Sequence, residues 1–243
     1  MKKSIILLLM FFAMVGLPAI SGAAITTFSG QDDGAPVGGP FPFSAAAQSS
    51  FETAAAGYGP LNTITFESLP IGFYTPFIAA PGVTVSLNVP ANYGPGYSGI
   101  SNFTYGYLYG FNTTPGGSQW LGFPGYPQGS ATFSFVNPTN SFGMYLTGLQ
   151  TYFTSTVTIS FWDGSVEFLS VPVNVNGGAQ YYGFTDSIPT SRVTITDISQ
   201  PYGWDYWGID DVTYNRGVPE PCTMLLLGSG LVGFAAFRKK FRA

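Results

Sequence analysis

Between residues 62 and 214 the chain is divided into short segments in which apolar and polar residues alternate, and Gly, Pro, Asn or Asp separates one segment from the next. Ile64 and Phe66 share one face of the first segment, and the apolar residues of 83–87 share one face of the second. A period of two lets a strand bury one face while the other meets solvent. About seven to ten such strands predict an all-β fold, a single antiparallel β-sandwich of jelly-roll-like topology over residues 61–216.

The remaining segments show the same alternation, and turn residues separate them. They lie at residues 131–136, 141–149, 155–162, 166–175, 179–186, 191–198 and 207–214. Asp163 and Gly164 separate two of these segments with a sequence typical of a β-hairpin loop. Thr and Ser form rows at the outward positions, which suits a sheet face in contact with water.

Histidine is absent from the sequence, and the single cysteine, Cys222, lies in the C-terminal tail. The body therefore has no internal disulfide and no thiolate metal site. Ser-His-Asp and Cys-His catalysis and histidine-ligated zinc are excluded as well, because each of them needs an imidazole. The 32 glycines and 19 prolines disfavour helices in the body, whereas an aromatic share of 17% suits pleated sheets.

Charge is distributed unevenly along the chain, although the formal net charge is only −4. Arg192 and Arg216 are the only basic residues between residues 25 and 217, a stretch that holds eleven of the twelve acidic residues. Binding of nucleic acid requires clustered Lys and Arg, so nucleic acid is excluded as a partner of this stretch. A divalent cation fits its charge better.

The N-terminal part of the chain differs from the alternating body. Residues 1–24 are predicted to be a secretory signal peptide with a signal helix, because two lysines precede an apolar core and small residues follow it. This prediction implies export through the Sec translocon, and a retained membrane anchor is the alternative. Residues 25–60 are rich in Gly, Ala, Ser and Pro and predict a loose segment, with a short helix near residues 44–57 and Ser44 as its N-cap.

The C-terminal segment, residues 217–243, has three parts: a Pro-Glu-Pro motif, an uncharged apolar run and a basic cluster. These parts comprise Val218, Pro219, Glu220, Pro221 and Thr223, then residues 224–237, then Arg238, Lys239 and Lys240. As a helix the apolar run spans about 21 Å, less than a hydrocarbon core of about 30 Å, so it is a marginal permanent anchor. The positive-inside rule keeps the basic cluster in the cytoplasm, so we expect a transient inner-membrane anchor with the body outside. A buried C-terminal helix is the alternative.

This order of parts resembles the PEP-CTERM sorting signal of exported proteins of Gram-negative bacteria. The resemblance covers 23 residues, from Val218 to Lys240. It implies recognition by an exosortase, which is thought to cut near the motif during export. Proteins with this signal are associated with extracellular polysaccharide and biofilm, so the resemblance implies a place at the cell surface or in the extracellular matrix. It says nothing about the activity of the body.

Four acidic residues are candidates for a calcium site. Glu67 ends an early strand, Asp210 and Asp211 lie in the last predicted strand, and Asp205 precedes that strand. The first and last strands of a jelly roll are often neighbours, so the four carboxylates could converge on one Ca²⁺, which takes six to eight oxygen ligands. The order of short segments over residues 62–214 loosely resembles galactose-binding-like jelly rolls, in which acids at comparable places hold a structural calcium. The alternative is a hydrogen-bonded structural aspartate whose neighbour faces solvent.

Residues 92–130 hold ten glycines and ten aromatic residues. Exposed aromatic rings on Gly-rich loops stack on the apolar faces of sugars, so a carbohydrate-binding surface is one interpretation. Its members would be Tyr105, Tyr107, Tyr109 and Trp120, joined from a second aromatic cluster by Trp204. The alternative is a strand over residues 103–111 whose alternating aromatic row packs in the core. In the second cluster, Trp207 is expected to be the core residue.

These observations predict a non-catalytic exported protein, a structural or carbohydrate-associating component of extracellular polysaccharide. A secreted glycan-active hydrolase is the alternative, because two carboxylates about 5 to 9 Å apart supply the residues of that mechanism. The acids available for such a pair are Glu67, Asp163, Glu167 and Asp186. No spacing in the sequence singles out two of them.

Overall fold

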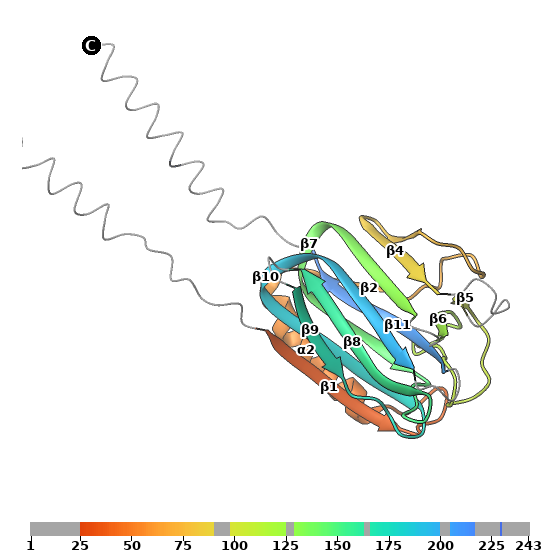
Figure 1. Cartoon of the computed structure of the whole chain (residues 1–243). Helices are drawn as coiled ribbons and strands as arrows, with labels where there is room; N and C mark the ends of the chain where they lie inside the picture. The colour runs from red at the N-terminus through yellow and green to blue at the C-terminus, as the bar shows by residue number, and fades with distance from the viewer. Residues whose placement is uncertain are drawn as a thin grey trace, which may run out of the picture.

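The computed structural model describes residues 25–89, 98–124, 129–162, 166–199, 205–216 and 229. As predicted, the body is an antiparallel β-sandwich, and one α-helix lies on an outer face (Figure 1). The predicted signal helix and C-terminal hydrophobic helix fall outside the described residues, apart from Ser229. Within the described part of the chain, no helix is both long enough and apolar enough to cross a membrane.

Two strands are much longer than the others and belong to both layers of the sandwich. They are β7 (Ser130–Thr147) and β10 (Gly178–Ser199). The register between them shifts near their middles, so each strand bends there and continues in the other layer. Pro138 and Pro189 lie near these bends, where a missing N–H need not cost a ladder hydrogen bond. Two strands therefore contain the segments predicted separately at 131–136, 141–149, 179–186 and 191–198.

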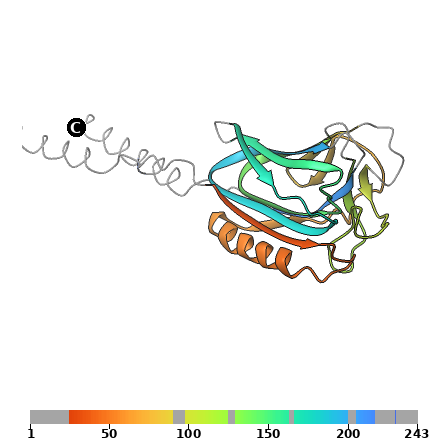
Figure 2. The ribbon, with the colours of Figure 1, turned by 60° about the horizontal axis from the view of Figure 1, so that its bottom comes forward.

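Every strand pair in the two layers is antiparallel. The first layer joins one half of β7 and of β10 to β3 (Phe77–Ala80), β4 (Val83–Asn88), β8 (Thr154–Trp162) and β9 (Val166–Val171). The second layer joins their other halves to β1 (Thr26–Asp33), β2 (Leu61–Ile64), β5 (Gly99–Ser101), β6 (Trp120–Pro124) and β11 (Tyr206–Asn215). We call the second layer the helix-bearing layer, because the helix α2 lies on its outer face, as Figure 2 shows.

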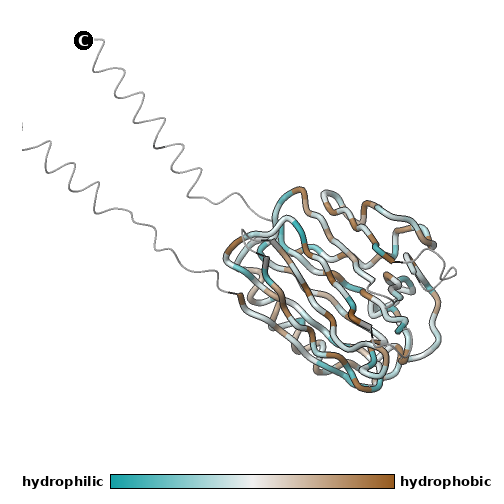
Figure 3. The backbone as a smooth tube through the Cα atoms, viewed as in Figure 1, coloured by the Kyte–Doolittle hydropathy of each residue, from teal (hydrophilic) through white to brown (hydrophobic). Residues whose placement is uncertain are grey.

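The core between the layers is rich in phenylalanine. Phe161 of β8 and Phe184 of β10 stack across it, with ring centroids 4.4 Å apart and an interplanar angle of 13°. The inward positions predicted in residues 64–66 and 83–87 are buried, and Trp207 is a fully buried core residue, as expected. Figure 3 shows the change between apolar and polar residues along the strands. Burial of each such large side chain stabilises the fold by roughly 1.5–3 kcal/mol.

Residues 25–60 are part of the folded body, so the prediction of a loose segment is wrong. β1 pairs along its whole length with β10, and α2 (Pro42–Ala55) leads into the short 3₁₀ helix η1 (Ala56–Tyr58). The predicted helix near residues 44–57 is confirmed. Periodicity was weak in this stretch because Ala and Ser supply most of the buried face of α2, and Phe51 is its one large buried side chain.

The expected N-cap of this helix is wrong, because a neighbouring strand supplies the cap. The helix begins at Pro42 with Phe41 as the N-cap residue, and Ser44 lies buried in its first turn. The carboxylate of Asp32, at the end of β1, accepts hydrogen bonds from the backbone N–H groups of Phe43 (3.1 Å) and Ser44 (2.8 Å). A negative charge at this position also matches the positive end of the helix dipole.

Phe51 fixes α2 to the helix-bearing layer. Its ring lies against Gly143 and Gly183, which face each other in the register of β7 and β10, and we call these two residues the glycine seat. A Cβ atom would lie 3.0 Å from the Phe51 ring at Gly143 and 2.8 Å from it at Gly183. Tyr145 and Tyr181, with ring centroids 5.2 Å apart, complete this second small core. The missing side chains of the glycine seat therefore allow the helix to approach the sheet.

The described body has two different ends. Ile25 precedes β1 and Arg216 follows β11 at the same end of the helix-bearing layer, where Arg216 donates its N–H to the carbonyl of Pro60. At the other end, Gly178 of β10 donates its N–H to the carbonyl of Tyr107. The eight residues of β1 separate the two ends by roughly 25 Å. The first and last residues of the described body and the aromatic loop thus lie at opposite ends of the sheet.

Candidate functional site

A cleft opens on the helix-bearing layer next to the beginning of α2. Its walls are residues 37–41 and 112–118, and Asn102 and Thr104 contribute from an adjacent segment. Its volume of about 520 Å³ lies within the usual range of ligand sites, roughly 300–1,000 Å³. Amides, hydroxyls, prolines and the ring of Phe41 line the cleft, and none of its described lining residues is charged. We call this feature the loop cleft.

Glu67 holds one side of the wall 112–118. Its Oε1 atom accepts hydrogen bonds from the backbone N–H groups of Ser118 and Gln119, both at 2.8 Å, and from Nδ2 of Asn112 at 2.8 Å. The Asn112 amide also donates to the carbonyl of Gln119 at 2.9 Å. A single carboxylate oxygen thus connects the two ends of this wall. Charge-assisted hydrogen bonds of this kind are about twice as strong as neutral ones.

Asp210 and Asp211 of β11 hold the other side of this wall. Oδ2 of Asp210 accepts from the N–H of Thr113 (2.7 Å), from its hydroxyl (3.1 Å) and from the N–H of Thr114 (3.3 Å). Asp211 accepts from the hydroxyls of Thr113 (2.9 Å) and Thr114 (2.6 Å). Consecutive strand residues normally face opposite sides, but Asp211 has a positive φ of 46° and the register shifts after Asp210. This bulge lets both carboxylates reach one loop.

Asp210 is also electrostatically unusual. Burial raises its pKa to about 7, and the neighbouring charge of Asp211 acts in the same direction, while the hydrogen bonds from Thr113 lower it. Its side chain is fully buried, and Oδ1 has no hydrogen-bond partner. The carboxyl group therefore changes charge near neutral pH, directly behind the wall of the loop cleft.

The four acids proposed for calcium do not come together. Glu67, Asp210 and Asp211 surround one loop, whereas Asp205 accepts hydrogen bonds from the N–H of Gln150 (2.8 Å) and from a threonine hydroxyl (2.9 Å) elsewhere. Among the described residues, no group of three or more Asp, Glu, Cys or His side chains is arranged to hold a metal ion. Loop N–H and hydroxyl groups bond Oε1 of Glu67, both oxygens of Asp211 and Oδ2 of Asp210, which leaves few oxygens for a cation. The hydrogen-bonded alternative describes these contacts better.

Asp205 belongs to a second buried network that the sequence did not reveal. Thr154 donates its hydroxyl hydrogen toward Oδ2 of Asp205 (2.9 Å), and its oxygen lies 3.4 Å from Oδ2 of Asp197. The same Asp197 oxygen accepts a hydrogen bond from the indole N–H of Trp207 at 3.0 Å. Burial raises the pKa of Asp205 to about 7, against the lowering effect of hydrogen bonds from Gln150 and Thr154. This network ties β8, β10 and β11 together.

The aromatic segment 103–111 is irregular, so the alternative of a core strand is wrong. Tyr105, Tyr107 and Tyr109 are exposed by 53%, 41% and 37%, and only the end of the row, Phe111, is fully buried. Ring centroids of Tyr105 and Tyr109 lie 5.4 Å apart, and Tyr109 stacks on Tyr206 at 6.4 Å. The three tyrosines thus form an exposed aromatic surface, which we call the tyrosine loop.

The two tryptophans predicted for a sugar surface have different outcomes. Trp120 is only 3% exposed, so it is not a binding platform. Its indole N–H donates to the carbonyl of Phe103 at 3.2 Å, and its ring leaves no room for a Cβ atom at Gly110 or Gly208. It anchors the tyrosine loop from beneath. Trp204 lies outside the described residues.

The acids proposed for a hydrolase are dispersed. Glu167 lies on β9 of the first layer, and buried Asp186 lies on β10, where it accepts a hydrogen bond from the N–H of Ile188 at 3.0 Å. Glu67 is engaged by the wall of the loop cleft. Asp163 lies outside the described residues. Nothing in the described contacts joins two of these acids into a pair.

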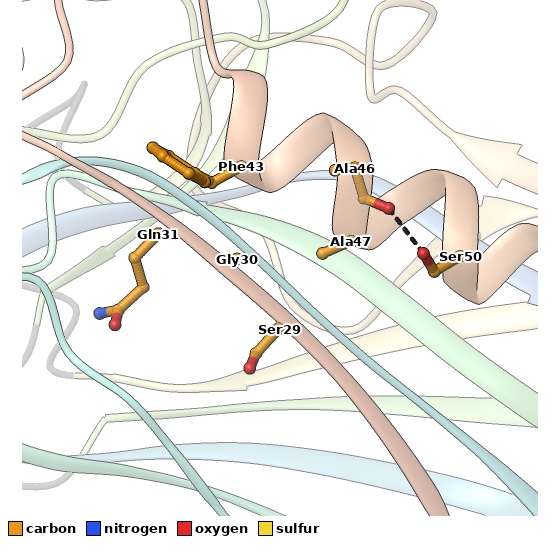
Figure 4. A pocket seen from close by; sticks show the side chains of 7 residues that line it. All are labelled: Ser29, Gly30, Gln31, Phe43, Ala46, Ala47 and Ser50. Carbon is orange, nitrogen blue, oxygen red and sulfur yellow. Dashed lines mark hydrogen bonds between the residues drawn. The ribbon is translucent and has the colours of Figure 1, made fainter.

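A second hollow lies between β1 and α2 (Figure 4). Small and neutral residues line it, with Phe43 at one side, and its volume is about 560 Å³. The hydroxyl of Ser50 is turned back to the carbonyl of Ala46 at 2.9 Å, within the helix. The loop cleft has more polar lining residues than this hollow, so it is the better candidate site.

The described body defines the protein as an antiparallel β-sandwich with one helix, and the chain beyond it carries a transport signal. Residues 217–240 match the PEP-CTERM protein-sorting motif. This match confirms the resemblance seen in Val218–Pro221 and in the basic cluster, although these residues lie outside the described part. The motif implies an exported protein, sorted at the membrane and processed by an exosortase. No curated protein matches the sequence.

Several solved structures are similar to this chain. The K2 cleaved adhesin domain of Lys-gingipain is 13% identical, with 65% of this chain and 100% of that chain covered and a TM-score of 0.41. TmCBM61 in complex with β-1,4-galactotriose is 15% identical over 68% of this chain and 93% of its own, with a TM-score of 0.32. The CBM22-1–GH10 modules of xylanase 10B from Clostridium thermocellum, complexed with xylohexaose, are 11% identical over 65% and 28%, with a TM-score of 0.34. At these identities and TM-scores, the similarity does not assign a ligand to this chain. A ligand must be inferred from the residues of the chain itself.

Proposed function

We propose that this exported protein is a non-catalytic module that associates with carbohydrate through the loop cleft and the tyrosine loop. The observation that carries the proposal is an uncharged polar cleft of about 520 Å³ on the same loop segment as three exposed tyrosines. Tyrosine rings stack on the apolar faces of sugars, while amides and hydroxyls bond their hydroxyl groups. This combination fits a glycan better than an apolar ligand.

The sorting motif supports an extracellular location for this proposed activity. In our proposal the chain crosses the inner membrane through the Sec translocon, is held there transiently by residues 217–243, and is released or transferred by an exosortase. The body then becomes a structural or glycan-associating part of extracellular polysaccharide or biofilm. Residues 1–24 act as the signal peptide in this scheme.

Absence of catalysis is part of the proposal. The carboxylates nearest to the loop cleft, Glu67, Asp210 and Asp211, accept hydrogen bonds from the loop itself. A general acid or base must instead reach the reacting atom of the substrate. These acids are better suited to shaping the cleft than to hydrolysis.

Binding and hydrolysis can be separated in one experiment. Full-length protein in detergent is incubated with a panel of polysaccharides, and both co-sedimentation and release of reducing sugar are measured. We expect binding without release, and a loss of binding of about tenfold or more in a Tyr105→Ala/Tyr107→Ala/Tyr109→Ala variant. Phe168→Ala is the matched control, because Phe168 is an exposed aromatic residue on β9 of the first layer. Release of reducing sugar that a Glu67→Gln substitution abolishes would establish the hydrolase instead.

A further inference from the structure

Several hydrogen-bond donors of the wall 112–118 are directed away from the interior of the loop cleft. Thr113 and Thr114 give both their N–H and hydroxyl hydrogens to Asp210 and Asp211, with donor–acceptor distances from 2.6 to 3.3 Å. Asn112 gives its amide hydrogens to Glu67 and to a backbone carbonyl. These donors of the wall are thus engaged by the carboxylates behind it and are not free to bond a ligand.

Backbone donors of the same walls are committed in the same way. The N–H of Ser118 bonds Glu67, the N–H of Gly117 bonds the carbonyl of Thr114 at 3.0 Å, and the N–H of Gly39 bonds the carbonyl of Pro36 at 3.0 Å. Pro40 and Pro115 have no N–H. A threonine hydroxyl that has donated its hydrogen still accepts through its lone pairs. The wall 112–118 is therefore biased toward accepting hydrogen bonds from a ligand.

The negative charge around the cleft also disfavours a ligand that carries only hydrogen-bond acceptors. Glu67, Asp210 and Asp211 lie directly behind the wall, and none of the described residues that line the cleft is a lysine or arginine. Arg192 and Arg216, the two basic residues of the body, lie on the long strand β10 and at the end of β11, away from these loops. A carboxylate or sulfate group on a ligand offers only acceptors and brings a like charge, so it meets no counter-charge among the described lining residues and finds the donors of Asn112, Thr113 and Thr114 already engaged.

We infer that the loop cleft takes an uncharged, hydroxyl-rich glycan and discriminates against polyuronates and sulfated glycans. This inference rests on the proposed function and adds the chemical class of its ligand. Sugar hydroxyls donate to the oxygens of Thr113 and Thr114, and the carboxylates behind the wall fix the direction of these bonds. Asp210 and Asp211 thereby act as specificity-determining positions without touching the glycan.

The test compares hexasaccharides of equal length by calorimetry with the full-length protein in detergent. Neutral hexasaccharides of glucose, galactose, mannose and xylose are measured beside those of galacturonate and mannuronate, at low and at high salt. We expect at least one neutral hexasaccharide to bind at least tenfold more tightly than either uronate, with a ratio that shrinks as salt screens the carboxylates. Equal or tighter binding of a uronate would overturn the inference but leave the proposed function intact. Failure of every hexasaccharide to bind would overturn both.

Two variants separate hydrogen-bond direction from net charge. Asp211→Asn keeps a residue type that tolerates a positive φ, and its amide can donate to a threonine oxygen, which frees that hydroxyl hydrogen for the ligand. We expect the uronate affinity relative to the neutral one to rise at least threefold. Asp33→Asn removes the same charge from an exposed residue that bonds Asn176, outside the cleft lining, and should change the ratio by less than twofold. Equal shifts in both variants would show that only net charge matters.

A third variant keeps the test independent of the stability of Asp211→Asn. Thr114→Val retains the shape of the side chain and removes its oxygen, so neutral hexasaccharides should bind at least threefold more weakly. Unchanged neutral binding in a folded Thr114→Val protein, as judged by circular dichroism, would contradict the proposed role of this acceptor.

Discussion

The helix-bearing layer holds two additions to its outer face by opposite means. The helix α2 is held by the Phe51 ring in the glycine seat, in a small apolar core with Tyr145 and Tyr181. The wall 112–118 of the loop cleft is held by carboxylates that accept hydrogen bonds from its backbone and hydroxyls. Apolar packing does not respond to pH, whereas a buried carboxylate does. One sheet thus carries an addition held mainly by apolar packing, with Asp32 as its only described carboxylate cap, beside one held mainly by carboxylates.

The largest expected effect on the free energy of unfolding comes from removing the Phe51 ring that packs in the glycine seat. Phe51→Ala should lower the free energy of unfolding by about 3–5 kcal/mol, because a fully buried ring is lost over two glycines that cannot fill the space. Urea denaturation at pH 5 and pH 8 should give the same loss. Phe43→Ala on the same helix is the control, since Phe43 is 67% exposed, and it should change the unfolding free energy by under about 0.5 kcal/mol.

The pH dependence of stability should come from Asp205 and Asp210. Their pKa values in the folded protein are raised to about 7 from an ordinary value of 3.8, so the folded state binds more protons than the unfolded state between these values. Stability should therefore fall as pH rises from about 4 to about 7, by an amount on the order of 2–4 kcal/mol for each group. Asp205→Asn and Asp210→Asn should each flatten the curve, measured by urea denaturation across this range, while exposed Asp33→Asn should not. Equal slopes in all four proteins would contradict this explanation.

A smaller effect on the free energy of unfolding is expected from adding a side chain at the glycine seat. Gly183→Ala places a Cβ atom 2.8 Å from the Phe51 ring and should cost about 1–3 kcal/mol. In a Phe51→Ala background the same change should cost less, because the ring is gone and only the Cα of Gly143, at 3.2 Å, remains close to the new Cβ atom. Such a double-mutant cycle measures the coupling between helix and sheet directly. Additive costs would show that the glycine is needed for another reason.

The smallest effect should come from removing divalent cations. Addition of EDTA should shift the thermal midpoint by under about 1 °C, because loop donors already satisfy Glu67, Asp211 and one oxygen of Asp210. A ligand that binds only the folded state must raise the midpoint. A rise of several degrees with CaCl₂ would show that the wall 112–118 rearranges around a cation.

Strand positions could be predicted where alternation involves large side chains. β4, β8 and β11 lie within a residue or so of their expected segments, because Val, Ile, Phe and Trp mark the buried face. β1 escaped prediction, because its one buried residue is the polar Asp32. The helix α2 was predicted, but its packing on the sheet was not, since the seat for Phe51 lies more than ninety residues away along the chain. The hydrophobic periodicity of a segment cannot reveal a packing site for it that lies far away along the chain.

For the candidate site, the sequence singled out acids and tyrosines that lie on or beside the loop cleft, but it did not show the contacts of these acids. Glu67, Asp210 and Asp211 were conspicuous in a chain with few charges, yet the loop that occupies them could be seen only in three dimensions. Trp120 was expected on the surface and is buried, because Gly110 and Gly208 admit its ring into the interior. The wall 37–41 gave no signal, since its Gly and Pro residues indicate only a turn.

The separation of the chain ends from the loops has a consequence for many copies together. Arg216, the last body residue before the sorting motif, is fixed by its bond to Pro60, roughly 25 Å from the end that carries the tyrosine loop. Molecules attached through their C-terminal tails would carry their tyrosine loops at the end of the body farther from the attached end. A long glycan crossing several such molecules meets one weak contact after another, and each contact raises the effective concentration for the next. Firm retention of a polymer then requires only modest affinity from each cleft.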